Sequence, residues 1–388
     1  MTTTAAAALL LMPLLYGDLH VAVRSGDIER VKALLAAGAR VNERDTLGGT
    51  ALHDAAWAGD EAMTQLLLAN GASVFLRHAE GGSTPLHYAI VTNHPGVAKI
   101  LMTAGADVKA VTYSGSTPLH LAASRGFIDV LRLLLARGLA VQARDKSGAT
   151  PLDEAAFRGH AGAVKLLLEK GAAPQTGLIP AASRGHAEVV KLLVEAGARP
   201  DVPDASGVTA LGEAMRLRQT RPVEALLAAG AKLDLGKALQ EAVLKGHTEM
   251  VAALLARSGP PDAMGFLLHD AALKGHAGVA YLLLSKGADP RRVNALGSTP
   301  LHDAALAGHR EVAELLLDRG APIDARDRDA AATPLFLAAS FGRLAVLDLL
   351  LERGADATLP NRGGQTPLDA AVASGYTPVA ERLKTVRK

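Results

Sequence analysis

Residues 117–126 read TPLHLAASRG, and this phrase predicts a short helix with a marked start and a marked end. Thr117 suits the position just before a helix, where its side chain can cap the first turn, and Pro118 suits the first helical position. The two consecutive alanines are small enough for a neighbouring helix to pack closely against them. Gly126 can adopt the left-handed conformation that ends many helices.

The same phrase recurs along most of the chain at a nearly constant spacing. Its first four residues are repeated in full from Thr84 and from Thr299. Looser copies start at Thr50, Thr150, Thr209, Thr333 and Thr366. Behind each copy, apolar residues at helical spacing predict a second helix, which a Gly-Ala pair ends. Intervals of 33 and 34 residues separate the pairs at Gly38, Gly71 and Gly105, a period that predicts stacked repeats.

This repeat resembles the ankyrin repeat over almost all of residues 17–388. The resemblance implies an all-α solenoid of about twelve helix-turn-helix repeats, with short β-hairpin fingers between them and with the first and last repeats acting as caps. The spacing shortens to 26 residues between Gly171 and Gly197, and it is also short before Gly259 and Gly287. We therefore expect the fingers to be missing or stunted before the sixth, eighth and ninth helix pairs.

An apolar segment precedes the repeats in residues 1–16. Its run from Ala5 to Leu15 is too short for a transmembrane helix, which needs about 20 residues. The run fits the apolar core of a secretory signal peptide, although the usual basic flank is missing. Two interpretations stay open: a signal that directs an exported or periplasmic protein, or an apolar cap on the first helix of a cytoplasmic protein. No other stretch is long and apolar enough to span a bilayer.

Composition narrows the function classes. The 41 Lys and Arg residues nearly balance the 39 Asp and Glu residues, giving a net charge of +2, which argues against nucleic-acid binding. Aromatic residues make up 3% of the chain and offer few platforms on which bases could stack. The chain has no cysteine, so disulfides, thiolate nucleophiles and Cys-ligated zinc are excluded.

The chain has 13 histidines, which suggest a metal or catalytic site, but nearly all of them follow the repeat. One set holds the position after Leu: His20, His53, His87, His120, His269 and His302. A second set follows the position that ends the helix: His94, His160, His186, His247, His276 and His309. Equivalent positions in neighbouring repeats lie about 8–10 Å apart, which is too far for shared ligation of zinc at about 2 Å. The resemblance implies that the first set forms hydrogen bonds that tie turns together.

No motif for catalysis stands apart from the repeat. The chain has no His-Glu-x-x-His and no Gly-x-Ser-x-Gly. Residues 230–237 look like a phosphate-binding loop, but they have one residue too many between the glycines, and Ala238 stands where Ser or Thr would bind magnesium. We therefore predict no catalytic residue, no metal site, no cofactor and no enzyme activity.

The resemblance also implies a protein-binding scaffold that recognises a partner protein through a concave groove. In the family, the two residues before the helix-ending Gly tend to face that groove. The predicted partner-binding set is Trp57, Arg125, Phe157, Arg158, Arg184, Arg216, Lys245, Lys274 and Phe341. Its cations form a basic stripe that favours an acidic segment of a partner, with Trp57 and Phe157 as apolar anchors. We expect the chain itself to be a monomer.

Two alternatives stay open. Some of these cations have an acid four residues earlier on the same predicted helix, which allows weak surface pairs instead of a ligand role. The pairs are Glu154–Arg158, Glu241–Lys245 and Asp270–Lys274. The cations without an acid four residues earlier are Arg125, Arg184 and Arg216. A second function class is a regulatory or substrate-recruiting subunit of an enzyme encoded elsewhere, which would use the same surface.

Overall fold

The computed structural model describes residues 19–258 and 264–386, which are almost entirely helices and turns. Within these ranges there is no strand, and one isolated bridge joins Arg44 to Thr50. The predicted all-α repeat architecture is thereby confirmed. The predicted N-terminal segment of residues 1–16 and the junction before the ninth helix pair, residues 259–263, lie outside the described residues. The chain divides into two compact units, one ending at Ala231 and the other starting at Lys232.

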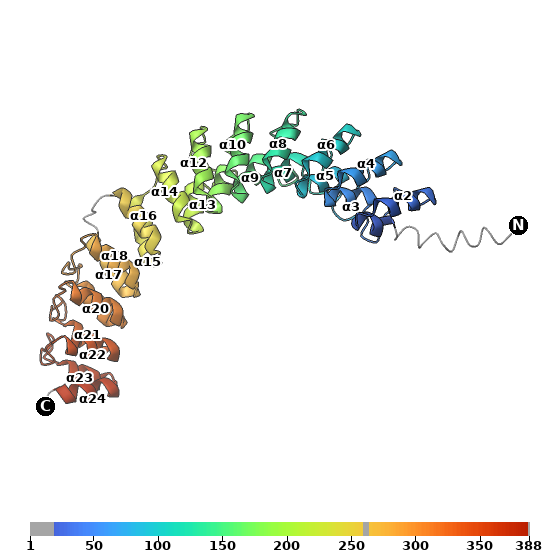
Figure 1. Ribbon diagram of the computed structural model, residues 1–388. Helices are drawn as coiled ribbons and strands as arrows, with labels where there is room; N and C mark the ends of the chain where they lie inside the picture. The colour runs from blue at the N-terminus through green and yellow to red at the C-terminus, as the bar shows by residue number, and fades with distance from the viewer. Residues whose placement is uncertain (1–18, 259–263, 387–388) are drawn as a thin grey trace, which may run out of the picture. The chain divides into compact units, whose positions relative to one another are not determined.

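The first unit is a stack of helix pairs (Figure 1). It begins with the helical residues 19–24. Its inner helices pack on one another in order and are called the inner row: α3 (Ala51–Ala58), α5 (Pro85–Val91), α7 (Pro118–Arg125), α9 (Pro151–Arg158), α11 (Leu178–Ser183) and α13 (Ala210–Arg216). Its outer helices are α2 (Ile28–Ala36), α4 (Glu61–Ala69), α6 (Pro95–Thr103), α8 (Ile128–Leu135), α10 (Ala161–Glu169), α12 (Ala187–Glu195) and α14 (Thr220–Ala228).

The second unit repeats this arrangement. Its inner helices are α15 (Leu235–Leu244), α17 (Met264–Lys274), α19 (Pro300–Ala307), α21 (Pro334–Ser340) and α23 (Pro367–Ala373). Its outer helices are α16 (Thr248–Ser258), α18 (Ala277–Ser285), α20 (Arg310–Asp318), α22 (Leu344–Glu352) and α24 (Thr377–Val386). Neighbouring inner helices pack on one another, and each also packs on the outer helix of its own repeat.

Both ends of α7 form as its phrase predicts. Thr117 has an extended backbone, and its hydroxyl accepts a hydrogen bond from the His120 N–H at 3.4 Å, while Pro118 opens the helix. Gly126 ends the helix with a φ of +71°. A Cβ on this glycine would lie 2.8 Å from the ring of His160, so the position needs glycine for space as well as for its backbone.

The histidines after Leu tie neighbouring repeats together. The Nδ1 atom of His120 accepts a hydrogen bond from the Thr117 N–H at 3.2 Å. Its Nε2 atom lies 3.0 Å from the carbonyl oxygen of Ala149 in the next repeat. Equivalent pairs of bonds are made by His53, His87 and His302. The expected hydrogen-bonding role is confirmed for these four. His20 and His269 also reach a backbone carbonyl oxygen through Nε2, but their Nδ1 atoms face aspartates instead of a threonine.

The core lies between the inner and outer helices of each repeat. Leu119 of α7 and Leu131 and Leu134 of α8 are fully buried. Burying such a side chain stabilises the fold by roughly 2 kcal/mol. The alanine pair at Ala122 and Ala123 is also fully buried, because α5 and α9 both pack against α7. The small side chains therefore set how closely the repeats stack.

The connections between repeats differ in length. Residues 104–117 form a finger whose tip is closed by a hydrogen bond of 3.0 Å from the Thr112 N–H to the Ser116 carbonyl oxygen, so it is a turn rather than a pair of strands. Only residues 170–177 lie between α10 and α11, and only residues 229–234 lie between α14 and α15. The expectation of stunted fingers before the sixth and eighth helix pairs is confirmed.

Candidate partner-binding surface

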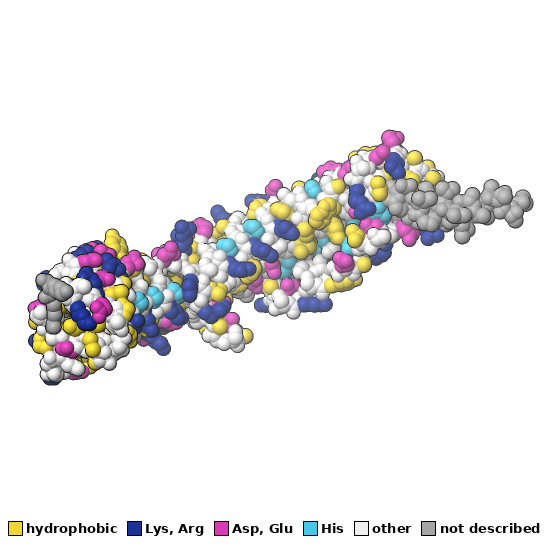
Figure 2. All heavy atoms as spheres, turned by 90° about the horizontal axis from the view of Figure 1, so that it is seen from below, with side chains coloured by type: hydrophobic (Ala, Val, Ile, Leu, Met, Phe, Trp, Pro, Cys, Tyr) yellow, Lys and Arg dark blue, Asp and Glu magenta, His cyan; other side chains and the backbone are white. Residues whose placement is uncertain are grey.

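The inner row presents the C-terminal ends of its helices on one face of the first unit. Figure 2 views the molecule from the side on which the inner row lies in Figure 1, and Lys and Arg side chains recur along it. Trp57, Arg125, Phe157 and Arg158 lie in the last turns of α3, α7 and α9, and Arg184 directly follows α11. Phe157 is half-buried and the other four are exposed. The structure thus brings five of the predicted residues onto one surface.

An open hollow of about 710 Å³ lies on this surface. It is lined by Val91, Leu121, Ser124, Arg125, Phe127, Arg158 and His160. Two guanidinium groups therefore border a hollow whose remaining lining is largely apolar. A pocket of this kind can hold an apolar side chain beside an anionic group.

Phe157 holds two cations near its ring. The guanidinium carbon of Arg184 lies 4.2 Å from the ring centroid, and that of Arg158 lies 5.8 Å from it. The electron-rich face of an aromatic ring attracts cations, so Phe157 positions both arginines. The half-buried ring is therefore partly engaged within the protein itself.

The predicted weak surface pairs are formed only in part. Lys245 donates to the Glu241 carboxylate at 2.5 Å, as expected. In the described residues, Glu154 makes no ion pair with Arg158, so this alternative does not account for Arg158. The same holds for Asp270 and Lys274, where the Asp270 carboxylate instead accepts a hydrogen bond from Gln240 at 3.4 Å.

Arg216 differs from its prediction. Its Nε and Nη2 atoms donate to the two carboxylate oxygens of Glu213 at 2.8 and 2.7 Å. The hydrogen bond from Arg216 lowers the pKa of the Glu213 carboxyl. Glu213 stands three residues before Arg216, a spacing that also brings side chains together on a helix, whereas the prediction considered only acids four residues earlier. Arg216 therefore already has an anionic partner.

Three predicted residues lie in the second unit. Lys245 directly follows α15, Lys274 is the last residue of α17, and Phe341 directly follows α21. All three are exposed, and 45% of Phe341 is accessible to solvent. They hold the same repeat position as the residues of the first unit, but each unit presents its own surface.

Trp57 has an aromatic neighbour that the sequence did not indicate. More than half of Trp57 is exposed, at 55%, and its ring meets that of Tyr88 edge to face at 5.6 Å. Burial and the nearby carboxylates of Asp54 and Asp45 raise the pKa of Tyr88. Tyr88 lies one turn before Val91 on α5, so the helical period could have placed it on this face.

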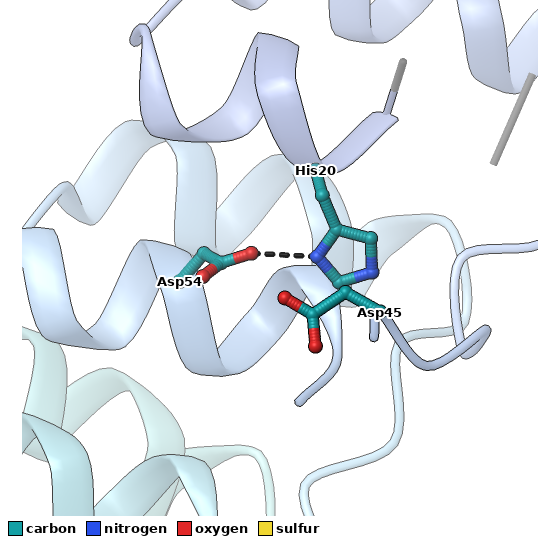
Figure 3. A group of neighbouring side chains, drawn as sticks. All are labelled: His20, Asp45 and Asp54. Carbon is teal, nitrogen blue, oxygen red and sulfur yellow. Dashed lines mark hydrogen bonds and ion pairs between the residues drawn. The ribbon is translucent and has the colours of Figure 1, made fainter. Parts of the chain in front are cut away.

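Among the described residues, His20, Asp45 and Asp54 form a cluster whose residue types suit a metal, with ligand atoms within 4.8 Å of one another (Figure 3). The cluster already has its own cations. Arg24 lies 3.1 Å from Asp45 and 3.6 Å from Asp54. Burial lowers the pKa of His20, but its hydrogen bond to Asp54 at 2.6 Å and the charge of that carboxylate outweigh burial and raise it. We therefore interpret the cluster as a network of ion pairs.

Comparison with known families shows what these repeats are. A model of three consecutive ankyrin repeats matches residues 19–112, 105–177 and 239–327. A model of many ankyrin repeats matches residues 335–383, and a model of a single repeat matches residues 175–205. The chain belongs to the ankyrin repeat family. No curated protein matches this ankyrin chain.

Family membership indicates what such repeats generally do. Ankyrin repeats are generally protein–protein interaction modules and are typically not enzymes. No helix among the described ankyrin repeats is long and apolar enough to cross a membrane.

Proposed function

We propose that this ankyrin repeat protein is a non-enzymatic scaffold whose inner row in the first unit binds an acidic segment of a partner protein. The observation that carries the proposal is the row of Arg125, Arg158 and Arg184 at the C-terminal ends of three consecutive inner helices. All three are exposed, and within the described ranges none forms an ion pair with an acid. Arginine guanidinium groups bind carboxylates through paired hydrogen bonds, so an acidic segment complements this row.

The apolar residues beside the row supply the other part of the proposed contact. Trp57 exposes an aromatic ring on α3, and Phe157 presents its ring among the arginines on α9. Interfaces commonly place their energetically important contacts on Trp and Arg residues. We expect Trp57 to gain the most burial on binding, because Phe157 is already half-buried.

Charge reversal of the row tests the proposal. The variant R125E/R158E/R184E should lose partner proteins captured from the source cell, as identified by mass spectrometry. The matched control R132E/K165E/K191E makes the same charge change at exposed positions on α8, α10 and α12 and should keep them. Circular dichroism checks that both variants remain helical. If the first variant retains its partners with unchanged salt sensitivity, the proposal is wrong. An enzyme activity that co-purifies with the wild type would favour the regulatory-subunit alternative.

A further inference from the structure

The three arginines have a regular spacing that a bound segment must match. Arg125 and Arg158 are the last residues of α7 and α9, and Arg184 directly follows α11, so the three arginines lie at the same place in consecutive repeats. Packed helices lie about 8–10 Å apart. A polyproline II chain has three residues per turn and rises about 3.1 Å per residue, so every third side chain points the same way at a step of about 9 Å. A β-strand cannot do this, because its side chains alternate between two faces.

The same surface changes character along the row. The arginines lie on α7, α9 and after α11, whereas the preceding helices α3 and α5 contribute Trp57, Tyr88 and Val91. Leu121 and Val91 also line the hollow beside Arg125. The surface is therefore aromatic and apolar at one end and basic at the other. Aromatic-lined surfaces suit polyproline II segments, which lose little conformational entropy on binding.

A helical ligand fits these observations less well. A helix rises about 1.5 Å per residue, so it would need one acid every seven residues to follow the same arginines. The span from Trp57 to Arg184 covers four repeat steps, which correspond to about 13 residues of polyproline II but to nearly 30 residues of helix. On this span Trp57 is exposed and Tyr88 and Phe157 are half-buried, so a ligand of about 13 residues already reaches both the aromatic and the basic parts of the surface.

We propose that the bound segment is a polyproline II stretch of about 13 residues with a carboxylate at every third position, which contacts Arg125, Arg158 and Arg184 in turn. Apolar residues continue the same period toward Val91 and Trp57. This inference rests on the function proposed above and specifies the chemistry of its ligand.

Synthetic peptides test the spacing. Fluorescein-labelled peptides of identical Pro, Leu, Glu and Ser composition carry Glu at every third or at every second position, with Leu continuing the period. The period-three peptide is made in two versions, one with the acidic residues at its N-terminal end and one with them at its C-terminal end. A longer, helix-forming peptide carries Glu at every seventh position. Fluorescence anisotropy measures their binding to the full chain, to R125E/R158E/R184E, to W57A and to the control R132E/K165E/K191E.

We expect one period-three peptide to bind about fivefold more tightly than the period-two peptide, because misplaced acids lose most of their ion pairs. W57A should weaken it severalfold, R125E/R158E/R184E should abolish it, and the control should leave it unchanged. Equal binding of all acidic peptides, still dependent on the arginines, would overturn the spacing and leave the proposed function standing. If the helical peptide binds more tightly than the period-three peptides, the polyproline II spacing is likewise wrong, and the proposed function stands. If no peptide binds, both proposals fail.

Discussion

His87 and His20 hold the same position in their repeats, yet their rings face different partners. In the third repeat, His87 Nδ1 accepts hydrogen bonds from the Thr84 N–H at 3.0 Å and from its hydroxyl at 2.8 Å, and Nε2 donates to the Ala110 carbonyl oxygen at 3.1 Å. In the first repeat, His20 Nδ1 faces the Asp54 carboxylate at 2.6 Å and Nε2 faces the Glu43 carbonyl oxygen at 3.3 Å.

These partners fix different protonation states. A backbone N–H can only donate, so His87 Nδ1 must be unprotonated and the ring is neutral. Burial accordingly lowers the pKa of His87 to about 4. Both partners of His20 can only accept, so the ring makes both hydrogen bonds only when it is protonated. This agrees with the raised pKa of His20.

Two residues differ between these repeats. Thr stands three residues before His87, but Gly17 and Phe266 stand three residues before His20 and His269. The residue after the histidine position of the next repeat is Leu121 for His87, but Asp54 for His20 and Asp303 for His269. His269 repeats the arrangement of His20, with Nδ1 at 2.5 Å from Asp303 and Nε2 at 3.0 Å from the Arg292 carbonyl oxygen. Where the capping threonine is absent, the aspartate that follows the histidine position of the next repeat becomes the partner.

The largest expected effect is the response of the threonine-capped repeats to acid. The unfolded chain binds protons at His53 and His87 near pH 6.5, whereas burial lowers their folded pKa values to about 4. Stability should therefore fall as the pH drops from 6.5 toward 4, by on the order of 3 kcal/mol per histidine. Urea unfolding at pH 7 and at about pH 4.5 measures this loss.

The variant H87Q isolates the contribution of one histidine from the protonation of carboxylates in the same range. Glutamine does not titrate, and its amide can both donate and accept. The acid-induced loss should be smaller in H87Q than in the wild type by about 2–3 kcal/mol. An identical loss in both proteins would show that the neutral, capped histidine does not control acid stability.

Removing the Asp54 carboxylate that pairs with His20 should change stability less. This loss of stability should be largest at low pH, where the wild-type pair is intact. Because the folded pKa of His20 is raised, its contribution to stability is complete below pH 6.5 and is lost as the pH rises through the folded value. D54N should lower the pKa of His20 and cost about 1 kcal/mol at the acidic end of this range. NMR titration of the His20 ring measures the pKa. An unchanged value in D54N would contradict the ion pair, and D303N should leave His20 unaffected as the control.

The local features of this fold could be predicted from the sequence. The phrase at Thr117 predicted where α7 begins and ends, because capping, proline and glycine act within a few residues. It did not predict the contact between His20 and Asp54, which are 34 residues apart and meet only when one repeat stacks on the next. The fingers were expected as β-hairpins, but in the described residues they are turns with one isolated bridge, between Arg44 and Thr50. Hydrogen bonds between neighbouring tips, such as the one from the Tyr113 N–H to the Gly81 carbonyl oxygen at 2.9 Å, replace regular strand pairing.

For the candidate surface, the shared face could be predicted from the sequence, but the contacts between side chains could not. The repeat position placed Trp57, Arg125, Phe157 and Arg184 on one face of the first unit, because equivalent positions in stacked repeats share a face. The pairing of Arg216 with Glu213 depends on side-chain rotamers, and that detail is set by the structure rather than by the period. The aromatic contact between Trp57 and Tyr88 depends on the packing of two separate helices.

The smallest expected effect concerns the C-terminal ends of the inner helices. Here too, some repeats have the usual residue of the phrase, a glycine, and others have a different residue. Gly126 ends α7 with a φ of +71°, but Arg218 stands at the equivalent position after α13 with a φ of +58°. A non-glycine residue in this left-handed region costs roughly 1 kcal/mol, and glycine recovers that cost while adding some freedom to the unfolded chain. R218G should therefore stabilise the protein by about 0.5 kcal/mol in urea unfolding. G126A should do the reverse and by more, because its Cβ would also press against His160. If R218G instead destabilises the protein, contacts of the arginine side chain outweigh the backbone strain, and a glycine is not the optimal residue for ending every inner helix.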